Sequence, residues 1–182
     1  MRRCRPQLAC RPDDWAERTL NDGGWVEIVG EPAELGRGRP VTMAIGNFDG
    51  VHRGHQWLLS QLVEHAGREA CESCVLVFRP HPRVVLQPQA PRQFLTTPHQ
   101  QRDIFRRLGL DVLIEQHFDL AFAATEPEDF VARLSNNVDL RQVWVGHDFQ
   151  FGRNRAGNVD VLRELGGRFG FEVHAVEPVS YT

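Results

Sequence analysis

"VTMAIGNFDGVHRGHQ", residues 41–56, decides the fold of this chain, because an apolar run passes there into a glycine-rich turn. The first five residues, 41–45, are apolar but for one threonine and end at a glycine, which is typical of a buried strand. Beyond the turn, apolar side chains recur three and four positions apart, which is typical of an amphipathic helix. These positions are Leu58, Leu59, Leu62, Val63 and Ala66. The stretch therefore predicts a strand, a tight turn and a helix in direct succession.

The same alternation of strand and helix continues along the chain. Three helix starts are indicated: Thr97 before Pro98, Thr125 with Glu128 three residues on, and a segment near 159–169. Four further apolar runs predict buried strands, at residues 74–78, 111–115, 142–146 and 171–176. Apolar strands that alternate with helices predict a parallel sheet covered on both faces. We therefore expect a doubly wound α/β domain with a five-stranded sheet.

The length and composition set limits on the organisation and the partners. The 182 residues suit one domain, expected at 40–182, while 1–39 are rich in Arg, Pro and Gly and predict a loose extension or a short edge element. A net charge of −3 disfavours nucleic acid and anionic membranes as partners. No apolar stretch approaches the roughly 20 residues of a membrane helix, and no signal peptide is recognisable, so a cytoplasmic location is expected. The sequence carries no signal for an oligomeric state.

One cysteine motif requires a decision about metal binding. "CESC", residues 71–74, has the CxxC form, but no second pair of cysteines or histidines follows at zinc-finger spacing. In a reducing compartment we expect free thiols at the start of a buried strand, with metal or redox chemistry as the weaker alternative. No metal ligand on the protein is predicted.

Three polar loops follow predicted strands. They are "GNFDGVHRGH" after the first strand, "RPHPR" after the second and "GHDFQFGRNRAG" after the fourth. Because ligands of open parallel sheets bind at the carboxyl ends of the strands, we expect these loops to meet at one ligand site.

The first loop has the composition of a phosphate site. Its glycines allow a sharp turn, and the helix that begins near Gly54 offers free N–H groups and a favourable dipole to an anion. His52 and His55 flank that point, can donate to phosphate oxygens and can carry charge near neutral pH. Surface or core histidines are the alternative. Asp49 can orient a histidine, contact the nucleotide or a metal, or merely stabilise the turn. The loop lacks a P-loop lysine and a GxGxxG fingerprint.

HxGH at a strand-to-helix turn resembles the signature of the nucleotidylyltransferase superfamily. A longer ordered set resembles the FMN adenylyltransferase module of the bacterial FAD synthetases, the bifunctional riboflavin kinase/FMN adenylyltransferases. The similarity covers residues 41 to about 178 and implies a Rossmann-like fold of the HxGH type. The set consists of "GNFDGVHRGHQ", "FRPHPR", "LTT", "VGHDFQFG" and "RAGNVDVLRELG".

The resemblance implies a reaction in which ATP and FMN give FAD and pyrophosphate, with Mg²⁺ carried by the substrate phosphates. It implies catalytic roles for Asn47, His52 and His55. It places the ATP at Gly46, Phe48, Asp49, Gly50 and Gly54. It places the FMN at His81, Pro82, Asp148, Phe149 and Phe151.

Several of these residues also have plainer interpretations. His81 can be an exposed imidazole on a rigid proline turn, and Phe149 and Phe151 can be ordinary core residues. Arg153 and Arg155 can attract phosphate or simply be solvated.

The chain departs from the family in two respects. Family modules continue past the fifth strand to a Ser-Ser-Thr-x-x-Arg type of motif, whereas this sequence stops at "VEPVSYT", so we expect a domain truncated at its C-terminus. We also expect no riboflavin kinase domain in this chain, and hence no phosphorylation of riboflavin. The alternative function is therefore a flavin- and ATP-binding fragment with little turnover. A third reading, another HxGH cytidylyl- or adenylyltransferase with a different phosphorylated acceptor, is disfavoured by "PHP" and "DFQFG".

Overall fold

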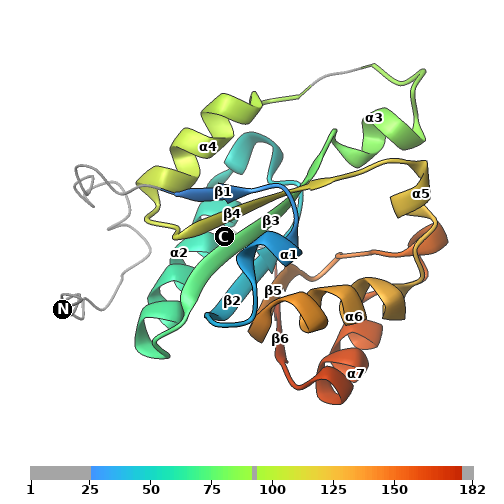
Figure 1. Cartoon of the computed structure of the whole chain (residues 1–182). Coiled ribbons are helices and arrows are strands. Elements are labelled where there is room, and N and C mark those ends of the chain that lie inside the picture. Colours follow the sequence, from blue (N-terminus) through green and yellow to red (C-terminus); the bar gives the residue numbers. More distant parts are fainter. Residues whose placement is uncertain (1–25, 92–93, 178–182) are drawn as a thin grey trace.

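A computed structural model describes residues 26–91 and 94–177. Its core is a single sheet of parallel strands in the order β1-β4-β3-β2-β5-β6 (Figure 1). The strands are β1 Glu27–Val29, β2 Pro40–Ile45, β3 Glu72–Arg79, β4 Val112–His117, β5 Asp139–Gly146 and β6 Glu172–Val176. All five predicted strands are confirmed, with ends that move by a few residues.

The predicted strand number is wrong by one. The additional strand, β1, pairs with β4 from Glu27 opposite Val112 to Val29 opposite Ile114, and it forms one edge of the sheet. Three residues are too short for a period-two pattern to stand out, so the strand itself is not recognisable, although a short edge element was one of the two expectations for residues 1–39. The sheet therefore begins before residue 40, whereas residues 1–25 of the predicted extension lie outside the described part.

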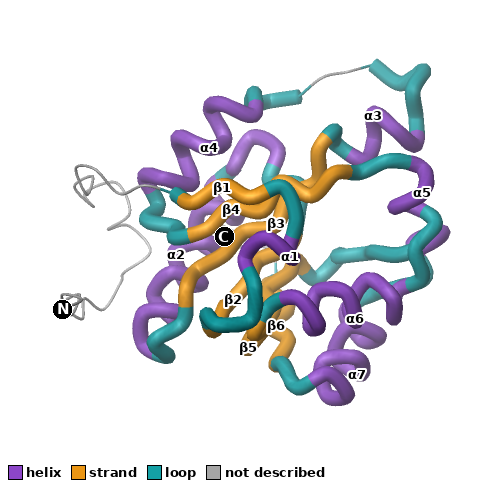
Figure 2. The backbone as a smooth tube through the Cα atoms, in the orientation of Figure 1, coloured by secondary structure: helices purple, strands orange, loops and turns teal. Residues whose placement is uncertain are grey.

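Helices cover both faces of the sheet, so the doubly wound prediction is confirmed (Figure 2). Successive residues of β2 point to opposite faces: Met43 joins one apolar cluster with α6 and α7, and Ala44 joins the other with α2 and α4. The helices are α1 Pro32–Leu35, α2 Arg53–Arg68, α3 Pro82–Leu86, α4 Pro98–Arg107, α5 Leu120–Ala123, α6 Pro127–Asn137 and α7 Val159–Phe169, and two 3₁₀ turns lie at Asp49–Val51 and Arg153–Arg155.

One predicted helix start is misplaced. α4 has the expected capping box between Thr97 and Gln100, but α6 has Glu126 at its N-cap, without a side-chain capping bond, and not Thr125. In both helices the residue at the N-cap is the one directly before proline, because proline is suited to the first helical position.

The strand order locates the switch point of the sheet. From β2 the chain runs outward through β3 and β4, and then returns to place β5 on the other side of β2. Ligands of such sheets bind at the carboxyl ends of the strands that flank the reversal, here β2 and β5. The loops that begin at Gly46 and Gly146 are therefore the first places to look for a site.

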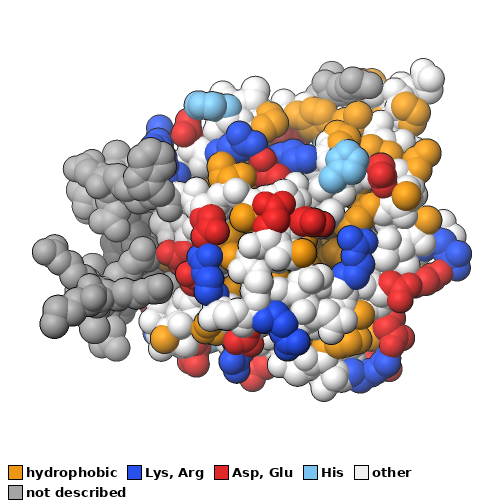
Figure 3. All heavy atoms as spheres, viewed as in Figure 1, with side chains coloured by type: hydrophobic (Ala, Val, Ile, Leu, Met, Phe, Trp, Pro, Cys, Tyr) orange, Lys and Arg blue, Asp and Glu red, His pale blue; other side chains and the backbone are white. Residues whose placement is uncertain are grey.

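The surface agrees with the balanced composition. Acidic and basic side chains are interspersed over the face that Figure 3 presents. Across residues 26–91 and 94–177, none of the helices has the length and apolar character needed to cross a membrane.

Candidate functional site

The histidine pair lies on the first turn of α2, directly after β2 and its 3₁₀ turn. His52 is the N-cap, and its Nδ1 accepts a hydrogen bond from the His55 N–H at 3.4 Å. The two imidazole rings stack with centroids 3.7 Å apart. A Cβ on Gly54 would lie 3.3 Å from the His52 ring, so the glycine leaves room for the stack. One N–H of the helix start is thus occupied by His52 in this structure, and an anion would compete with that cap.

His55 is the more buried of the two histidines. Its ring and that of Phe48 are arranged edge to face, with centroids 5.1 Å apart. The Nδ1 of His55 is buried without a hydrogen-bond partner. Burial and the neighbouring His52 lower the pKa of His55 to about 4, against an opposing effect from Asp148 and Asp49. His55 is therefore neutral at pH 7 here, whereas the sequence analysis expected that it can carry charge near neutral pH. Asp49, in the loop after β2, and Asp148, in the loop after β5, are thus near enough to His55 to act on its pKa.

The loop between β2 and α2 has a strained backbone. Phe48 adopts the left-handed conformation with φ 51°, is buried, and packs against Phe105 of α4 at 5.9 Å. The neighbouring Asn47 has a buried side-chain oxygen with no hydrogen-bond partner. Gln101 of α4 donates from its side-chain amide to the carbonyl oxygens of Asn47 and Phe48, at 2.8 Å in each case. Helix α4 thereby holds this loop.

Sequence reasoning missed Gln101. The available signal was its position three residues before Ile104 and four before Phe105, on the apolar side of a helix that is otherwise polar. A polar residue at such a position is buried and needs partners.

Asp49 holds a segment that is distant in the sequence. Its Oδ1 accepts from the backbone N–H of Leu95 at 2.9 Å and of Thr96 at 3.3 Å. The hydroxyl of Thr96 in turn accepts from the Gly50 N–H at 3.1 Å. At Gly50, φ is +72° and a Cβ would lie 2.8 Å from Leu95, so both backbone conformation and space require glycine. Sequence analysis gave Asp49 several possible roles. The structure shows a stabilising role, in which the Asp49 carboxylate holds the "LTT" segment at residues 95–97 against the turn.

His81 also has a structural role. It is the N-cap of α3, where its Nδ1 accepts from the Arg83 N–H at 3.1 Å, and Pro82 is the first helical residue. Its ring lies 5.0 Å from that of Phe94. Burial, followed by the charges of Arg79 and Arg83, lowers the pKa of His81, while Asp49 opposes the shift. The segment at Phe94 and Leu95 joins the two loops, because Phe94 contacts His81 and the Leu95 N–H donates to Asp49.

The loop after β5 divides into an exposed and a buried part. Asp148 is exposed, and Phe149 is half-buried and stacks on Phe151 at 5.4 Å. Phe151 keeps only 8% exposure, packs against Phe130 and belongs to the core. A Cβ on Gly157 would lie 2.7 Å from the Phe151 ring, so the Phe151 ring packs directly against the backbone at Gly157.

The side chain of Arg153, one of the two predicted arginines of this loop, is engaged at the start of α6. Arg153 forms an ion pair with Glu126 at the start of α6, and its backbone N–H donates to the Thr125 carbonyl at 2.8 Å. We assign no phosphate contact to it.

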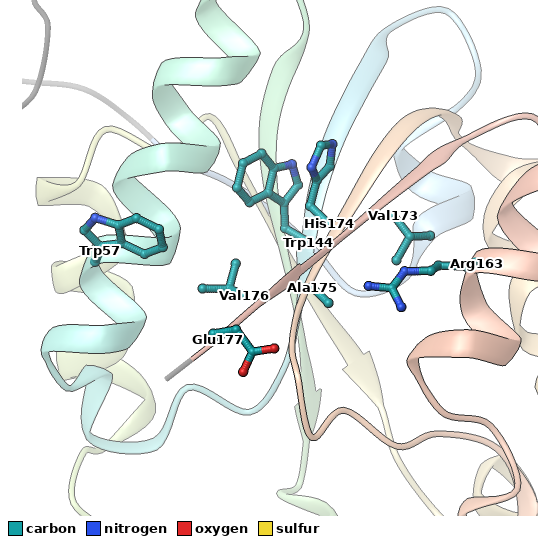
Figure 4. Close-up of a pocket in the computed structure, with 8 residues that line it drawn as sticks. All are labelled: Trp57, Trp144, Arg163, Val173, His174, Ala175, Val176 and Glu177. Carbon is teal, nitrogen blue, oxygen red and sulfur yellow. The ribbon is translucent and has the colours of Figure 1, made fainter. Parts of the chain in front are cut away.

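A separate groove of about 480 Å³ lies beside α2 at the β6 edge of the sheet. Trp57 projects from α2, and the Trp144 indole stacks on the His174 imidazole at 4.5 Å (Figure 4). None of the predicted site residues lines this groove, although Trp57 follows His55 by two positions. The predicted site is thus a convergence of loops and not the mouth of this groove.

Two cysteines, Cys71 and Cys74 of the CxxC motif, lie within the described part of the chain. Cys71 and Cys74 are free, and burial raises the pKa of the Cys74 thiol. Within the described ranges, no three histidine, cysteine or acidic side chains gather in a way that could hold a metal ion.

These features define a class: doubly wound α/β proteins with a histidine pair on a helix start at the switch point of the sheet. The family model for FAD synthetase matches residues 36–182, and the chain belongs to this family. The fold agrees with a crystal structure of a macrolide-efflux protein from Streptococcus pneumoniae, with a TM-score of 0.74 and 23% identity over 86% of this chain and 52% of that one. At that identity the likeness concerns the fold alone.

Curated relatives carry related names. A putative bifunctional riboflavin kinase/FMN adenylyltransferase of Geobacillus thermodenitrificans is 42% identical over 67% of this chain and 66% of its own length. A bifunctional riboflavin kinase/FMN adenylyltransferase of Pseudomonas fluorescens is 35% identical, over 78% of this chain and 45% of its own length. An FAD synthetase of Listeria monocytogenes is 36% identical, over 70% of this chain and 52% of its own length. The chain thus spans about half to two thirds of the length of these relatives.

Proposed function

We propose that this chain transfers the adenylyl group of ATP to FMN, giving FAD and pyrophosphate. The observation that carries the proposal is the stacked pair His52–His55 on the first turn of α2, at the switch point of the sheet. Membership of the FAD synthetase family and the names of the relatives support the same reaction.

The ATP phosphates bind at the start of α2. His52 and His55 donate to phosphate oxygens, and the helix N-terminus adds its dipole. The buried Oδ1 of Asn47 has no partner and can accept a hydrogen bond from the nucleotide. Gly46, Phe48, Asp49, Gly50 and Gly54 form the surrounding loop.

The FMN lies on the side of the loops after β3 and β5. His81 and Pro82 lie near its phosphate, while Asp148 and Phe149 contact the isoalloxazine. Phe151 supports Phe149 from the core, as their stacking at 5.4 Å indicates.

A cytoplasmic location stays a prediction.

The reaction needs no covalent intermediate on the protein. A phosphate oxygen of FMN attacks the α-phosphorus of ATP, the bond to the β-phosphate oxygen breaks, and pyrophosphate leaves. The task of the residues is to align two anions and stabilise the charge that develops. Mg²⁺ carried by the phosphates would offset the repulsion between the substrates.

The test incubates the protein with FMN, ATP and Mg²⁺ and separates flavins by chromatography. FAD should appear with the wild-type chain, and turnover should fall at least about a hundredfold in H52A or H55A while FMN affinity changes little. Binding of both substrates without FAD would favour the alternative, a flavin- and ATP-binding module. Absence of binding of either substrate overturns both. A reaction without ATP is the control and should yield no FAD.

A further inference from the structure

The side chain of Gln101 is buried, with 3% of the residue exposed, and every one of its hydrogen-bonding groups has a partner. Its amide nitrogen donates both protons to carbonyl oxygens of the loop after β2, those of Asn47 and Phe48. Its amide oxygen accepts from Arg79 at the end of β3. The residue therefore links α4, β3 and the predicted ATP-binding loop.

The far end of this link is fixed as well. Arg79 pairs with Glu115 of β4 at 3.2 Å, and Glu115 also pairs with Arg102, which follows Gln101 in α4. The pairs anchor the guanidinium that Gln101 faces. The amide oxygen of Gln101 is thus held by Arg79, and the amide nitrogen presents its two protons to the loop after β2.

The loop requires such support because Phe48 is left-handed. A side chain other than glycine reaches this conformation at a cost, and it persists when surrounding contacts enforce it. Gln101 holds the carbonyl on each side of the Phe48 Cα, and Phe105 of the same helix packs on its ring.

The direction of these carbonyls has a consequence for anions. In a trans peptide the C=O and N–H of one plane point in opposite directions. Because the carbonyls of Asn47 and Phe48 face Gln101, the N–H groups of Phe48 and Asp49 point away from it. Successive backbone N–H groups turned away from one support form a concavity that favours anions.

We propose that Gln101 is a positioning residue for adenylyl transfer: it sets the peptide planes of residues 47–49 and thereby directs their N–H groups toward the ATP phosphates. The inference rests on the proposed function for the identity of the anion. The orientation of the loop itself rests on the contacts of Gln101 alone.

The test compares Q101E with Q100E, the same change one position away on an exposed residue. A carboxylate at 101 keeps the shape and the contact with Arg79, which holds it ionised, but has no proton for the carbonyls of Asn47 and Phe48. At position 100 a carboxylate can still accept from the Thr97 N–H, so the capping box survives.

Three measurements are made on each protein: amide hydrogen exchange of residues 46–51, ATP and FMN affinity by calorimetry, and FAD formation. In Q101E, exchange in 46–51 and the dissociation constant for ATP should both rise about tenfold or more, with FMN affinity within about threefold of wild type. Q100E should match wild type in all three. A purely structural role would lower the folded fraction without changing the ATP affinity of the folded molecules.

Equal exchange and equal ATP affinity in Q101E and Q100E would overturn the inference while leaving FAD formation by the wild type intact. Failure of the proposed function is seen separately, in a wild-type protein that makes no FAD. If Q101E does not fold, Q101M takes its place, and unchanged exchange over 46–51 again counts against the inference.

Discussion

At the scale of single residues, the candidate site depends on the space beside one glycine. A Cβ on Gly54 would lie 3.3 Å from the His52 ring, so this ring would have to shift by a few tenths of an ångström relative to His55. We expect G54A to lower the rate of FAD formation at least about tenfold, because a shift of the donors misaligns the phosphates.

The matched control for this change lies in the same helix. Gly67 has nothing within 4 Å of its would-be Cβ. G67A should therefore leave FAD formation unchanged and add up to about 1 kcal/mol to the free energy of unfolding, through helix propensity alone. Equal turnover in the two variants would contradict the importance of the stack.

The low pKa of His55 predicts how stability depends on pH. Its folded value, about 4, lies below the ordinary value of 6.5, so the unfolded chain binds the proton more readily between these values. The contribution of His55 to stability is complete above pH 6.5 and is lost as the pH falls toward 4. Urea unfolding near about pH 7 and about pH 5 should show a smaller loss in H55Q than in wild type.

An exposed histidine provides the comparison. H117Q, a change at a side chain that is 74% exposed, controls for the effect of replacing a histidine on unfolding at about pH 7. A loss on acidification in H55Q equal to that of the wild type would show that His55 is not the group responsible.

At the scale of the elements, helix starts test how far local sequence rules reach. Thr97 accepts a hydrogen bond from the Gln100 N–H at the start of α4, whereas Thr125 caps no helix. T97A should therefore cost about 1 kcal/mol of unfolding free energy. T125A should cost less than about 0.5 kcal/mol, as measured by denaturant unfolding.

The same comparison shows what the sequence could predict. Strand and helix order follow from local periodicity and were predicted for β2 through β6 and for the longer helices. The contacts of Asp49 with Leu95 and Thr96, and of Gln101 with Asn47, join residues 46 to 54 positions apart. No local rule specifies such partners, because they depend on how the elements are placed in space. The sequence thus indicated which loops meet, but not which side chain holds them.

At the scale of the whole molecule, the sheet order explains why the site forms where it does. β2 and β5 are neighbours although about a hundred residues separate them, and their loops bring Asp49 and Asp148 close enough to act on the pKa of His55. The additional strand, β1, which is a short edge element of the kind expected among residues 1–39, lies at the edge far from this point. The error in strand number therefore left the predicted site unaffected.

That edge strand makes the domain boundary testable. Val29 and Leu35, from β1 and α1, are buried in the core cluster beside α6, and Arg39 bridges Glu27 of β1 to Glu72 of β3. A chain that starts at residue 40, the boundary predicted from the sequence, loses these contacts and bares the edge of β4. Burial of the two apolar side chains alone corresponds to about 3 to 6 kcal/mol as an upper range.

We therefore expect the shortened chain to unfold at a lower urea concentration than the full chain and to associate through the exposed edge of β4, which gel filtration would reveal. If it does not fold, V29A and L35A in the full chain test the same contacts, with an expected loss of about 1 to 4 kcal/mol each. The exposed Ile28, whose side chain lies outside the core, is the control, and I28A should cost less than either. An unchanged unfolding midpoint for the shortened chain would mean that residue 40 is the true start of the cooperative unit, and that β1 only rests on its edge.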